Sequence, residues 1–377
     1  MPQPNIGLLV LTLLGTAACA APTPPQETLT SEHHSFRVET VAAGLDHPWS
    51  LAFLPDGRML VTERAGRLRV IEQGALVPDP VTGVPAVAAW GQGGLLEVAV
   101  HPEFSGNGWL YLTYAAEGPG GAGTELARGR LTADGALEGL ERLFVAEPKS
   151  RGGRHFGSRI VFDGDGMVYF GVGERGDMER AQDLGDHAGS IIRLHDDGRV
   201  PADNPFVDQA GARPEIFAYG VRNPQGLLRH PETDAIWEHE HGPRGGDEVN
   251  IIRAGANYGW PVVTHGIDYS GISIGEGSSK PGMEPPVHYW VPSIAPSGMA
   301  YYDADRFPLW RGCLLVGSLK DRMLVRLTLD GERVVDEERL LKDRVGRIRD
   351  VRLGPDGLVY LLTDESNGRL LRLVPAE

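Results

Sequence analysis

Several short stretches of this sequence place polar side chains beside glycine or proline, just before or at the start of apolar, strand-like segments. These side chains include one imidazole, amide and hydroxyl groups, and three arginines: Gln92, His155, Arg222, Asn223, Ser293, Arg347 and Arg349. Guanidinium groups are costly to bury without anionic partners. If they converge in space, the arginines predict a ligand that carries several carboxylates or phosphates.

A second stretch, WEHEHGPRGGDEVNIIRAGANYGWP at residues 237–261, is rich in oxygen ligands. It contains four carboxylates, and the main-chain carbonyls around Gly242 and Pro243 can turn inward because glycines surround them. Mixed carboxylate and carbonyl oxygens suit Ca²⁺ better than zinc. A transition metal held by His239 and His241 is the weaker alternative, because no third histidine lies at a suitable spacing.

The elements that must position these residues are six similar units. Each has an apolar strand, a turn often spelled Asp-Gly and a second strand rich in Val, Leu and Tyr; the units begin at Trp49, Gly94, Ser158, Pro224, Pro296 and Arg349. Strands separated by such turns, without long helical periodicity, indicate antiparallel blades of four strands. The sequence therefore predicts an all-β fold, a six-bladed β-propeller.

A pair of β-sandwiches is the alternative fold, since it also contains many short strands. Sandwiches give the polar residues no common location, whereas every innermost strand of a propeller begins at the same end of the central channel. Five of the six units carry polar residues at that start. This favours the propeller and predicts that the residues meet at one mouth. The segment HSFRVETVA, from His34, is expected to close the ring against the last blade.

The composition excludes several classes of function. The chain has 377 residues, of which 51 are acidic and 36 are basic, and its formal net charge is −15. This charge disfavours binding to nucleic acid or to anionic membranes. The only cysteines are Cys19 and Cys313. A disulfide framework and a thiolate metal site are therefore excluded.

The N-terminus predicts export. An apolar run from Ile6 to Ala20, followed by small residues, indicates an export signal over residues 1–20 and a linker over 21–35, although no Lys or Arg precedes the run. The run is short for a membrane span, so no transmembrane span is expected in the mature chain, whose residues 36–377 would form one propeller domain. A lipid anchor on Cys19 is the alternative to simple cleavage. Both predict a periplasmic or outer-surface protein.

With these residues identified, the chain resembles the soluble, PQQ-dependent aldose sugar dehydrogenases of the glucose/sorbosone dehydrogenase family. The resemblance runs from about Val41 to Val374 and rests on motifs in the family's order: GQGGLL, RHFGSRIVF with GVGERGD, YGVRNPQGL, HGPRGGDEVN, NYGWP, SIAPSG, SLKDRMLVRL and RIRDVRLGPDG. It implies a six-bladed propeller that holds pyrroloquinoline quinone (PQQ) at its mouth. PQQ carries three carboxylates and therefore matches the expected polyanion.

The resemblance also implies roles for individual residues. Cofactor contacts fall on Arg222, Asn223, His241, Asp247, Ser293, Lys320, Arg347 and Arg349. The main-chain oxygens of Gly242 and Pro243 would bind the Ca²⁺ that accompanies PQQ. A second Ca²⁺ site would be formed by Glu248, Tyr258 and Asp268, where the sequence departs from the family pattern. Gln92 and Trp290 would contact the sugar.

The implied reaction oxidises the C1 hydroxyl of an aldose to the lactone, with hydride transfer to PQQ and passage of electrons to an external quinone, cytochrome or dye-like acceptor. His155 would be the general base, and Glu174 would hold its tautomer. Arg222 and Ca²⁺ would polarise the quinone. His241 and Arg154 differ from the residues of glucose-oxidising members, which predicts a different sugar preference.

Two other functions are compatible with the same fold, since a fold alone does not fix function. One is a propeller that binds a ligand and catalyses nothing. The other is a calcium-dependent lactonase or a similar hydrolase. Cationic side chains around the channel would serve no purpose for a neutral lactone, which favours the dehydrogenase.

Overall fold

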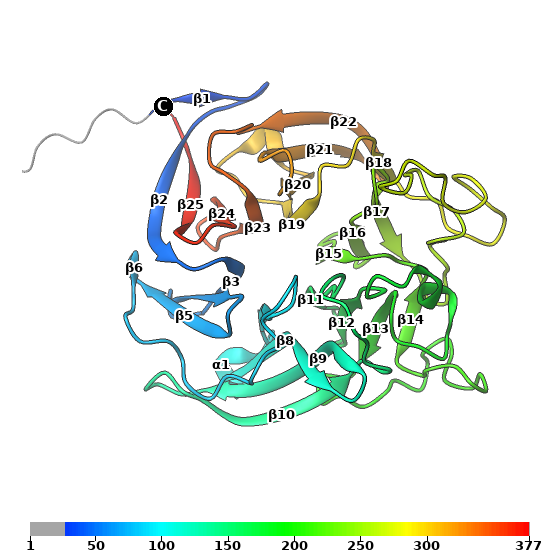
Figure 1. Cartoon of the computed structure of the whole chain (residues 1–377). Coiled ribbons are helices and arrows are strands. Elements are labelled where there is room, and N and C mark those ends of the chain that lie inside the picture. Colours follow the sequence, from blue (N-terminus) through cyan, green and yellow to red (C-terminus); the bar gives the residue numbers. More distant parts are fainter. Residues whose placement is uncertain (1–26, 377) are drawn as a thin grey trace, which may run out of the picture.

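Six β-sheets stand around a central axis like the blades of a propeller (Figure 1). The structure, a computed structural model, describes residues 27–376. The predicted fold is therefore confirmed. The expected export signal over residues 1–20 and Cys19 lie outside the described residues. Among residues 27–376, no helix is both long and apolar enough to cross a membrane.

Each of the first five sheets has four antiparallel strands. The first three sheets contain β3 (Pro48–Phe53), β4 (Met59–Glu63), β5 (Arg67–Glu72) and β6 (Ala75–Leu76); β7 (Leu95–Val100), β8 (Trp109–Gly118), β9 (Gly121–Leu131) and β10 (Leu137–Val145); and β11 (Ile160–Phe162), β12 (Val168–Val172), β13 (Ser190–Leu194) and β14 (Ile216–Tyr219). The fourth and fifth contain β15 (Pro224–Arg229), β16 (Ile236–Glu240), β17 (Asp247–Ile252) and β18 (His288–Trp290); and β19 (Pro296–Tyr302), β20 (Cys313–Ser318), β21 (Leu324–Asp330) and β22 (Arg333–Leu340).

The sixth sheet joins the two ends of the chain. It contains β23 (Ile348–Leu353), β24 (Val359–Thr363), β25 (Gly368–Pro375), β2 (Ser35–Leu45) and β1 (Leu29–Thr30). The pairing of β2 with β25 runs from Phe36 opposite Pro375 to Leu45 opposite Gly368. The expected closure by the segment from His34 is thus confirmed. The short strand β1 lies in the segment that was expected to be only a linker.

Helices contribute little to the described chain. They are α1 (Phe104–Asn107) and the 3₁₀ turns η1 (Met178–Gln182) and η2 (Pro308–Trp310). The strands are joined mainly by tight turns, and the Asp-Gly turns behave as the sequence predicts. Gly57 and Gly357 have φ of 89° and 76°, a conformation that a side chain disfavours.

The core is divided among the interfaces between neighbouring blades. One cluster of buried apolar residues fills each of the six interfaces: Leu60 and Leu112, for example, meet between the first and second blades, and Trp237 and Leu314 between the fourth and fifth. Both faces of a blade are therefore buried, which accounts for strands such as Met59–Glu63 in which every residue is buried.

Buried hydroxyl groups also tie blades together near the axis. Thr62 Oγ1 donates to the main-chain oxygen of Leu96 in the next blade at 2.6 Å, and Ser297 Oγ donates to that of Ile348 at 2.7 Å. These bonds satisfy innermost-strand carbonyls that the sheet ladders leave free. The starts of the six innermost strands are thereby held around the channel.

Candidate active site

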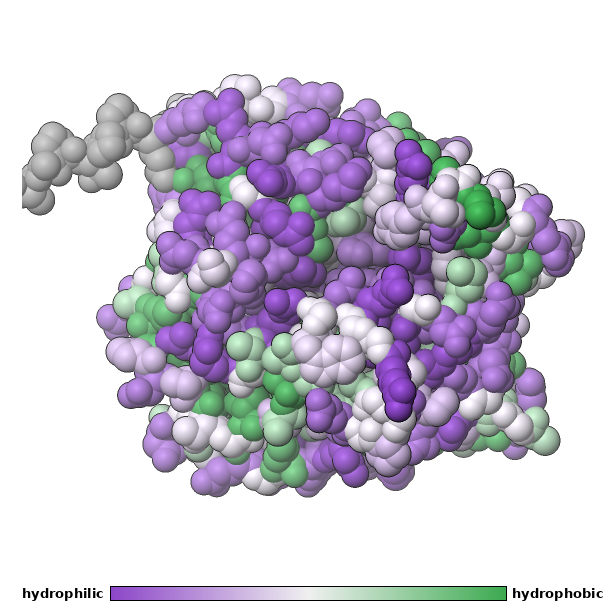
Figure 2. Space-filling model, viewed as in Figure 1, coloured by the Kyte–Doolittle hydropathy of each residue, from purple (hydrophilic) through white to green (hydrophobic). Residues whose placement is uncertain are grey.

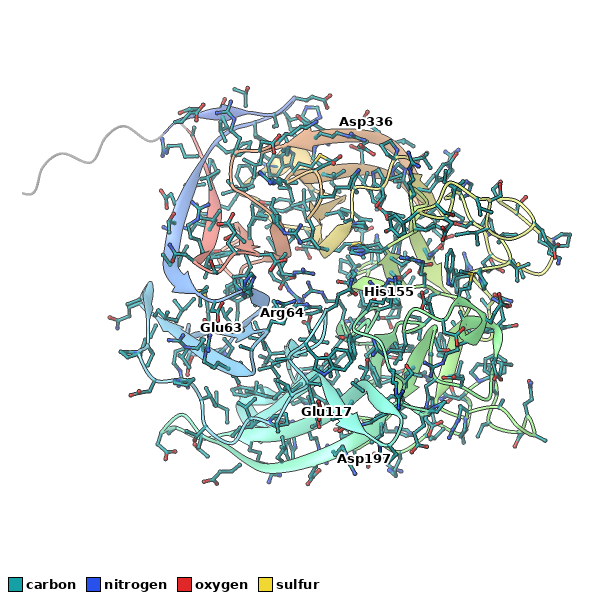
Figure 3. All side chains as sticks on the ribbon, in the orientation of Figure 1. Glu63, Arg64, Glu117, His155, Asp197 and Asp336 are labelled. Carbon is teal, nitrogen blue, oxygen red and sulfur yellow. The ribbon has the colours of Figure 1, made fainter. Side chains whose placement is uncertain are left out.

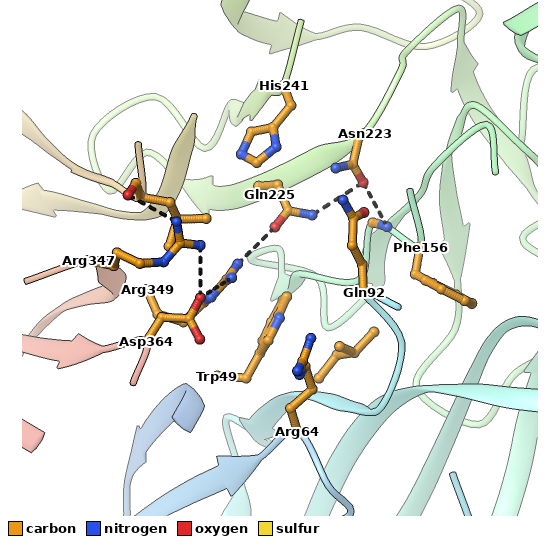
Figure 4. Close-up of a pocket in the computed structure, with 13 residues that line it drawn as sticks. Trp49, Arg64, Gln92, Phe156, Asn223, Gln225, His241, Arg347, Arg349 and Asp364 are labelled. Atoms are coloured by element: carbon orange, nitrogen blue, oxygen red, sulfur yellow. Dashed lines mark hydrogen bonds and ion pairs between the residues drawn. The ribbon is translucent and has the colours of Figure 1, made fainter. Parts of the chain in front are cut away.

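A cavity opens at one end of the channel, where innermost strands begin and second strands end. It has about 700 Å³ of space between protein atoms, part of it open to solvent, and Figure 4 shows its lining: Trp49, Arg64, Gln92, Leu96, Phe156, Gly157, Asn223, Gln225, His241, Leu319, Arg347, Arg349 and Asp364. Five of the residues singled out in the sequence line it. The predicted convergence at one mouth is therefore seen in the structure.

His155 is buried beside this cavity and points toward the axis in Figure 3. Its Nδ1 lies 2.6 Å from Oε1 of Glu174, which is also buried. A carboxylate in this position makes Nδ1 the protonated nitrogen and leaves Nε2 as a base. Nε2 makes no hydrogen bond within the described part of the chain. The geometry is that of a general base with an orienting partner.

The backbone of His155 is strained and firmly held. Its φ is 57°, in the left-handed region that a non-glycine residue seldom adopts. Its main-chain N–H donates to Oε1 of Gln92 at 2.8 Å, so one cavity residue fixes the base directly. Glu174 is joined to the next blade, because its N–H donates to the main-chain oxygen of Arg222 at 2.9 Å. The dyad is thus positioned by three blades.

Burial governs the protonation of this pair. It lowers the pKa of His155 below the ordinary value, against the opposing effect of Glu174. Burial is the largest single effect on Glu174 and acts to raise its pKa, but the hydrogen bond and charge of His155, the charge of Arg222 and the hydrogen bond from the N–H of Gly176 together lower that pKa below its ordinary value. At neutral pH the imidazole is therefore neutral and the carboxylate is charged, as a base needs.

Two arginines on one side of the cavity share a single carboxylate. Arg349 Nη2 lies 2.8 Å from Asp364 Oδ2, and Arg347 Nη2 lies 3.2 Å from the same atom. Burial is the largest single effect on Asp364 and acts to raise its pKa, but the charges and hydrogen bonds of Arg349, Arg347 and His47 together lower that pKa. Nε of Arg349 is buried and has no hydrogen-bond partner among residues 27–376. The pair therefore has unused charge and an unused donor for an anion.

Arg222 lines a small cavity that shares His241 with the main one, and its guanidinium contacts main-chain oxygens. Its Nη1 donates to the carbonyls of His241 at 2.9 Å and of Gly242 at 2.8 Å, while its buried Nε has no hydrogen-bond partner within the described residues. A side chain on Gly242 would collide with the carbonyl oxygens of Gly245 and Gly246. Main-chain oxygens therefore crowd this loop, and their chemistry suits a hard cation such as Ca²⁺.

Comparison with known proteins agrees with this geometry. The family model for glucose/sorbosone dehydrogenase matches residues 45–372. The chain belongs to the glucose/sorbosone dehydrogenase family. It is 46% identical over 380 residues to the aldose sugar dehydrogenase YliI of Escherichia coli, with each chain covered completely.

Solved structures are similar over most of the chain. A crystal structure of a glucose dehydrogenase is 52% identical, with a TM-score of 0.88 over 90% of this chain and 99% of that one. The PQQ-bound form of an aldose sugar dehydrogenase from Streptomyces coelicolor is 28% identical, with a TM-score of 0.75 over 93% of this chain and 100% of that one.

One residue that the family resemblance predicts to contact the sugar does not line the cavity. Trp290 is 2% exposed and packs in the apolar cluster between the fourth and fifth blades. Its Nε1 donates to Glu337 Oε2 at 2.9 Å, so its one polar atom is satisfied away from the cavity. The prediction that Trp290 contacts substrate is wrong, because the residue closes a blade interface. Gln92, the other expected sugar contact, does line the cavity.

Three residues expected from the family to contact the cofactor instead hold loops in place. Asp247 is fully buried and accepts hydrogen bonds from the N–H of Gly242 and of Ile294 and from Ser293 Oγ. Lys320 Nζ donates to the main-chain oxygen of Ser293 at 2.5 Å, and the side chain does not line the cavity. Asp247, Ser293 and Lys320 thus connect the fourth and fifth blades at the mouth.

The residues expected to form a second Ca²⁺ site do not share one surface. Glu248 and Tyr258 line the same small cavity beside Gly242. Tyr258 Oη, however, donates to the main-chain oxygen of Ile251 at 2.6 Å, and Asp268 is half-buried and accepts from the N–H of Ser270. Burial raises the pKa of Glu248 well above its ordinary value. Residues 27–376 contain no cluster of three metal-ligating side chains.

Sequence reasoning missed five polar or aromatic residues that line the cavity: Trp49, Arg64, Phe156, Gln225 and Asp364. Trp49 lies at the start of an innermost strand, so the rule that found the others applies to it. Arg64 and Asp364 follow the ends of β4 and β24, the second strands of their blades. Because hairpin strands are antiparallel, those ends return to the same mouth. The sequence therefore marks the ends of the second strands, as well as the starts of the innermost strands, as positions at the mouth.

A buried ring of charges lies next to Trp49, one of the residues that line the cavity. Arg159 Nη1 lies 2.8 Å from Glu97 Oε2 and 3.0 Å from Asp350 Oδ1, and Arg352 Nε lies 2.9 Å from the other oxygen of Asp350. Arg159 also packs over the ring of Trp49, 4.1 Å from its centroid. These pairs join the second, third and sixth blades, and Arg159 also contacts the first blade through Trp49.

Replacing Arg159 by Met should lower the free energy of unfolding by about 3–5 kcal/mol, because the buried carboxylates of Glu97 and Asp350 each lose one of their two arginine partners. Chemical denaturation measures this. The matched control is Arg253→Met, which removes an exposed pair with Glu332 and should cost less than about 1 kcal/mol. Equal losses in the two variants would contradict the assigned role of the ring.

Proposed function

We propose that this protein is a PQQ-dependent aldose dehydrogenase that oxidises the C1 hydroxyl of a sugar to the lactone and passes electrons to an external acceptor. The observation that carries the proposal is the buried dyad of His155 and Glu174 beside a cavity with surplus cationic groups. The relatives named above, one of them PQQ-bound, support it. When bound, PQQ supplies a quinone that accepts a hydride.

The residues present fit a flat tricarboxylate. Arg347 and Arg349 share one carboxylate, and the buried Nε atoms of Arg349 and Arg222 have no partner within the described chain. An anionic ligand supplies the missing acceptors, which offsets the cost of burying these groups. We assign Arg347, Arg349 and Arg222 to hold the cofactor, with Asn223 and His241 beside them. Gly242 and Pro243 are assigned to Ca²⁺.

Nε2 of His155 then accepts the proton of the sugar's anomeric hydroxyl group. Glu174 accepts the hydrogen bond from Nδ1–H and stabilises the imidazolium that forms. Gln92 holds the main chain of His155 and faces the cavity, so it orients both base and substrate. Arg222, fixed on main-chain oxygens next to the cavity, stabilises negative charge that develops on the reacting oxygen.

Reconstitution tests the proposal. Purified protein is treated with PQQ and Ca²⁺, and reduction of an artificial acceptor is followed with a broad panel of aldoses. Aldose-dependent turnover that needs PQQ supports the enzyme. If PQQ binds but no aldose is oxidised, the protein is a binding propeller; lactone hydrolysis without an acceptor identifies a hydrolase.

The acid limb of the pH profile should report His155. Because burial lowers the pKa of this imidazole, kcat/KM should remain above half of its maximum at pH 6.5, the ordinary value, and fall only at lower pH. In Glu174→Gln the limb should move further toward acid, because the carboxylate acts to raise that pKa. A midpoint above 6.5 in the unsubstituted protein would contradict the assignment of His155.

We also propose that the protein is exported and acts in the periplasm or at the outer surface, through the signal expected over residues 1–20 or a lipid anchor on Cys19. Fractionation of cells with and without a Cys19→Ala substitution tests this. Release of the variant from membranes supports the anchor. Retention of the protein in the cytosol overturns export.

A further inference from the structure

Some arginines at or beside the mouth of this acidic protein have no acidic partner. Most arginines of the described chain lie within 4 Å of a carboxylate, although the net charge is −15, but within residues 27–376 several form no ion pair with one. Among these, Arg64 lines the cavity, Arg154 directly precedes His155, and Arg222 directly precedes Asn223 of the cavity lining. Figure 2 shows strongly hydrophilic side chains around the central hollow. Unpaired cations beside a concave site attract anions.

Arg154 adjoins the base. It directly precedes His155, it is exposed, and its side chain lies over Gly176, where an added methyl group would meet its Nε, Cγ and Cδ. Its charge acts on the imidazole of His155 and lowers that pKa. Because no carboxylate within the described residues neutralises it, Arg154 carries an unpaired charge directly next to the proposed base, at the edge of the cavity that Phe156 and Gly157 line.

Arg64 supplies a second cation on the same side of the cavity. Its stem lies against Gly94 and its Nη1 donates to the main-chain oxygen of Gly91 at 2.7 Å, so it spans the loop that carries Gln92. It lines the cavity, as Figure 4 shows. Through its bond to Gly91, Arg64 is tied to the loop that carries Gln92, the residue assigned to the substrate.

The turn that carries Arg154 is rigid. Arg175 is buried and packs over Phe156, 3.4 Å from the ring centroid. Its Nη1 donates to the main-chain oxygen of Arg154, and its Nη2 donates to that of Gly152 at 2.7 Å. Burying a guanidinium only to hold main-chain oxygens is costly. This cost is understandable if the position of the turn matters for binding.

We propose that the preferred sugar carries an anionic group, a carboxylate or a phosphate, and that Arg154 and Arg64 bind it. This inference rests on the proposed function and names the substrate class of the same site. The sugar presents C1 to His155 while its anionic group contacts these guanidinium groups. Arg154 and Arg64 are thus specificity-determining residues and take no part in the chemical step.

The test compares matched sugars with the PQQ- and Ca²⁺-loaded protein. Galacturonate is paired with galactose, and glucose 6-phosphate with glucose, and the ratio of kcat/KM is measured at about 0.01 M and about 1 M salt. We expect one anionic sugar to be favoured at low salt and the preference to shrink at high salt. The pair that shows the preference identifies carboxylate or phosphate.

Variants locate the effect. Arg154→Gln and Arg64→Gln should each lower the anionic-to-neutral ratio about tenfold, the usual worth of one charge-assisted hydrogen bond. Arg306→Gln is the matched control: this arginine also lacks a carboxylate partner within the described chain, and it follows β19 at the end opposite the mouth. This substitution should leave kcat/KM unchanged for both the anionic and the neutral sugar.

Equal or higher kcat/KM for neutral sugars in the unsubstituted protein, or a ratio that both mouth variants leave within twofold, would overturn the proposal while aldose oxidation still stands. Absence of turnover with every sugar overturns the proposed function instead. In that case calorimetry of galacturonate, glucose 6-phosphate and their neutral partners decides the binding question by itself. If neither anionic sugar binds more tightly than its neutral partner, the proposal is overturned.

Discussion

Replacing His155 by Ala should lower kcat for aldose oxidation by about 10²–10⁴-fold, the usual contribution of a positioned general base. The reason is that Nε2 of His155 is the base assigned to the anomeric proton, and Glu174 already occupies the other ring nitrogen. PQQ should remain bound, because the cationic clamps lie on other blades. Single-turnover measurements, with the bound cofactor quantified by its absorbance, separate the two effects.

The matched control for this variant is His187→Ala. His187 is also buried, and its Nε2 lies 3.2 Å from a carboxylate of Glu215, but it does not line the cavity. Its loss should reduce stability and leave kcat per folded molecule unchanged. If the two variants lose activity in parallel, or if His155→Ala loses PQQ at unchanged kcat in the saturated enzyme, the role of His155 is wrong.

Replacing Arg349 by Met should weaken PQQ binding at least about thirtyfold, since truncating one member of a buried charged pair costs about 2–5 kcal/mol. Arg349 is buried, bonded to Asp364 and left with one unused donor, so its charge has few other ways to be satisfied. Equilibrium titration of apoprotein with PQQ measures the change. In enzyme saturated with PQQ, kcat should fall far less than the affinity.

Two further variants sharpen this result. Lys320→Met should weaken PQQ binding less than Arg349→Met, because Lys320 is half exposed and occupied by the carbonyl of Ser293. Arg128→Met, on the outer part of the second blade, removes a pair with Glu141 and should leave affinity unchanged. A Lys320 effect larger than that of Arg349 would restore Lys320 as the principal clamp.

The fold could be predicted because the same sequence pattern, a strand followed by a turn that is often Asp-Gly, recurs six times. Only a ring buries both faces of six small sheets. The rule that the innermost strands all start at the same mouth identified Gln92, Asn223, Arg347 and Arg349, because the topology alone brings those positions together. The same logic extended to the ends of second strands would have found Arg64 and Asp364.

Other parts of the site depend on packing that no strand pattern encodes. Trp290 and His241 both carry rings near the fourth blade, yet one fills an apolar interface and the other lines the cavity. Asp247 lies in a polar motif but turns inward to bind the N–H groups of two loops. Whether a polar side chain faces ligand or loop is decided by its neighbours in space.

The pairing of β2 with β25 makes the first and last parts of the described chain members of one sheet. A chain still being synthesised has no such partner for Phe36 to Leu45 until Gly368 to Pro375 have emerged. Contacts of this sequence separation form late and slowly. If the protein is exported, as we propose above, this delay postpones tight folding until translocation is complete.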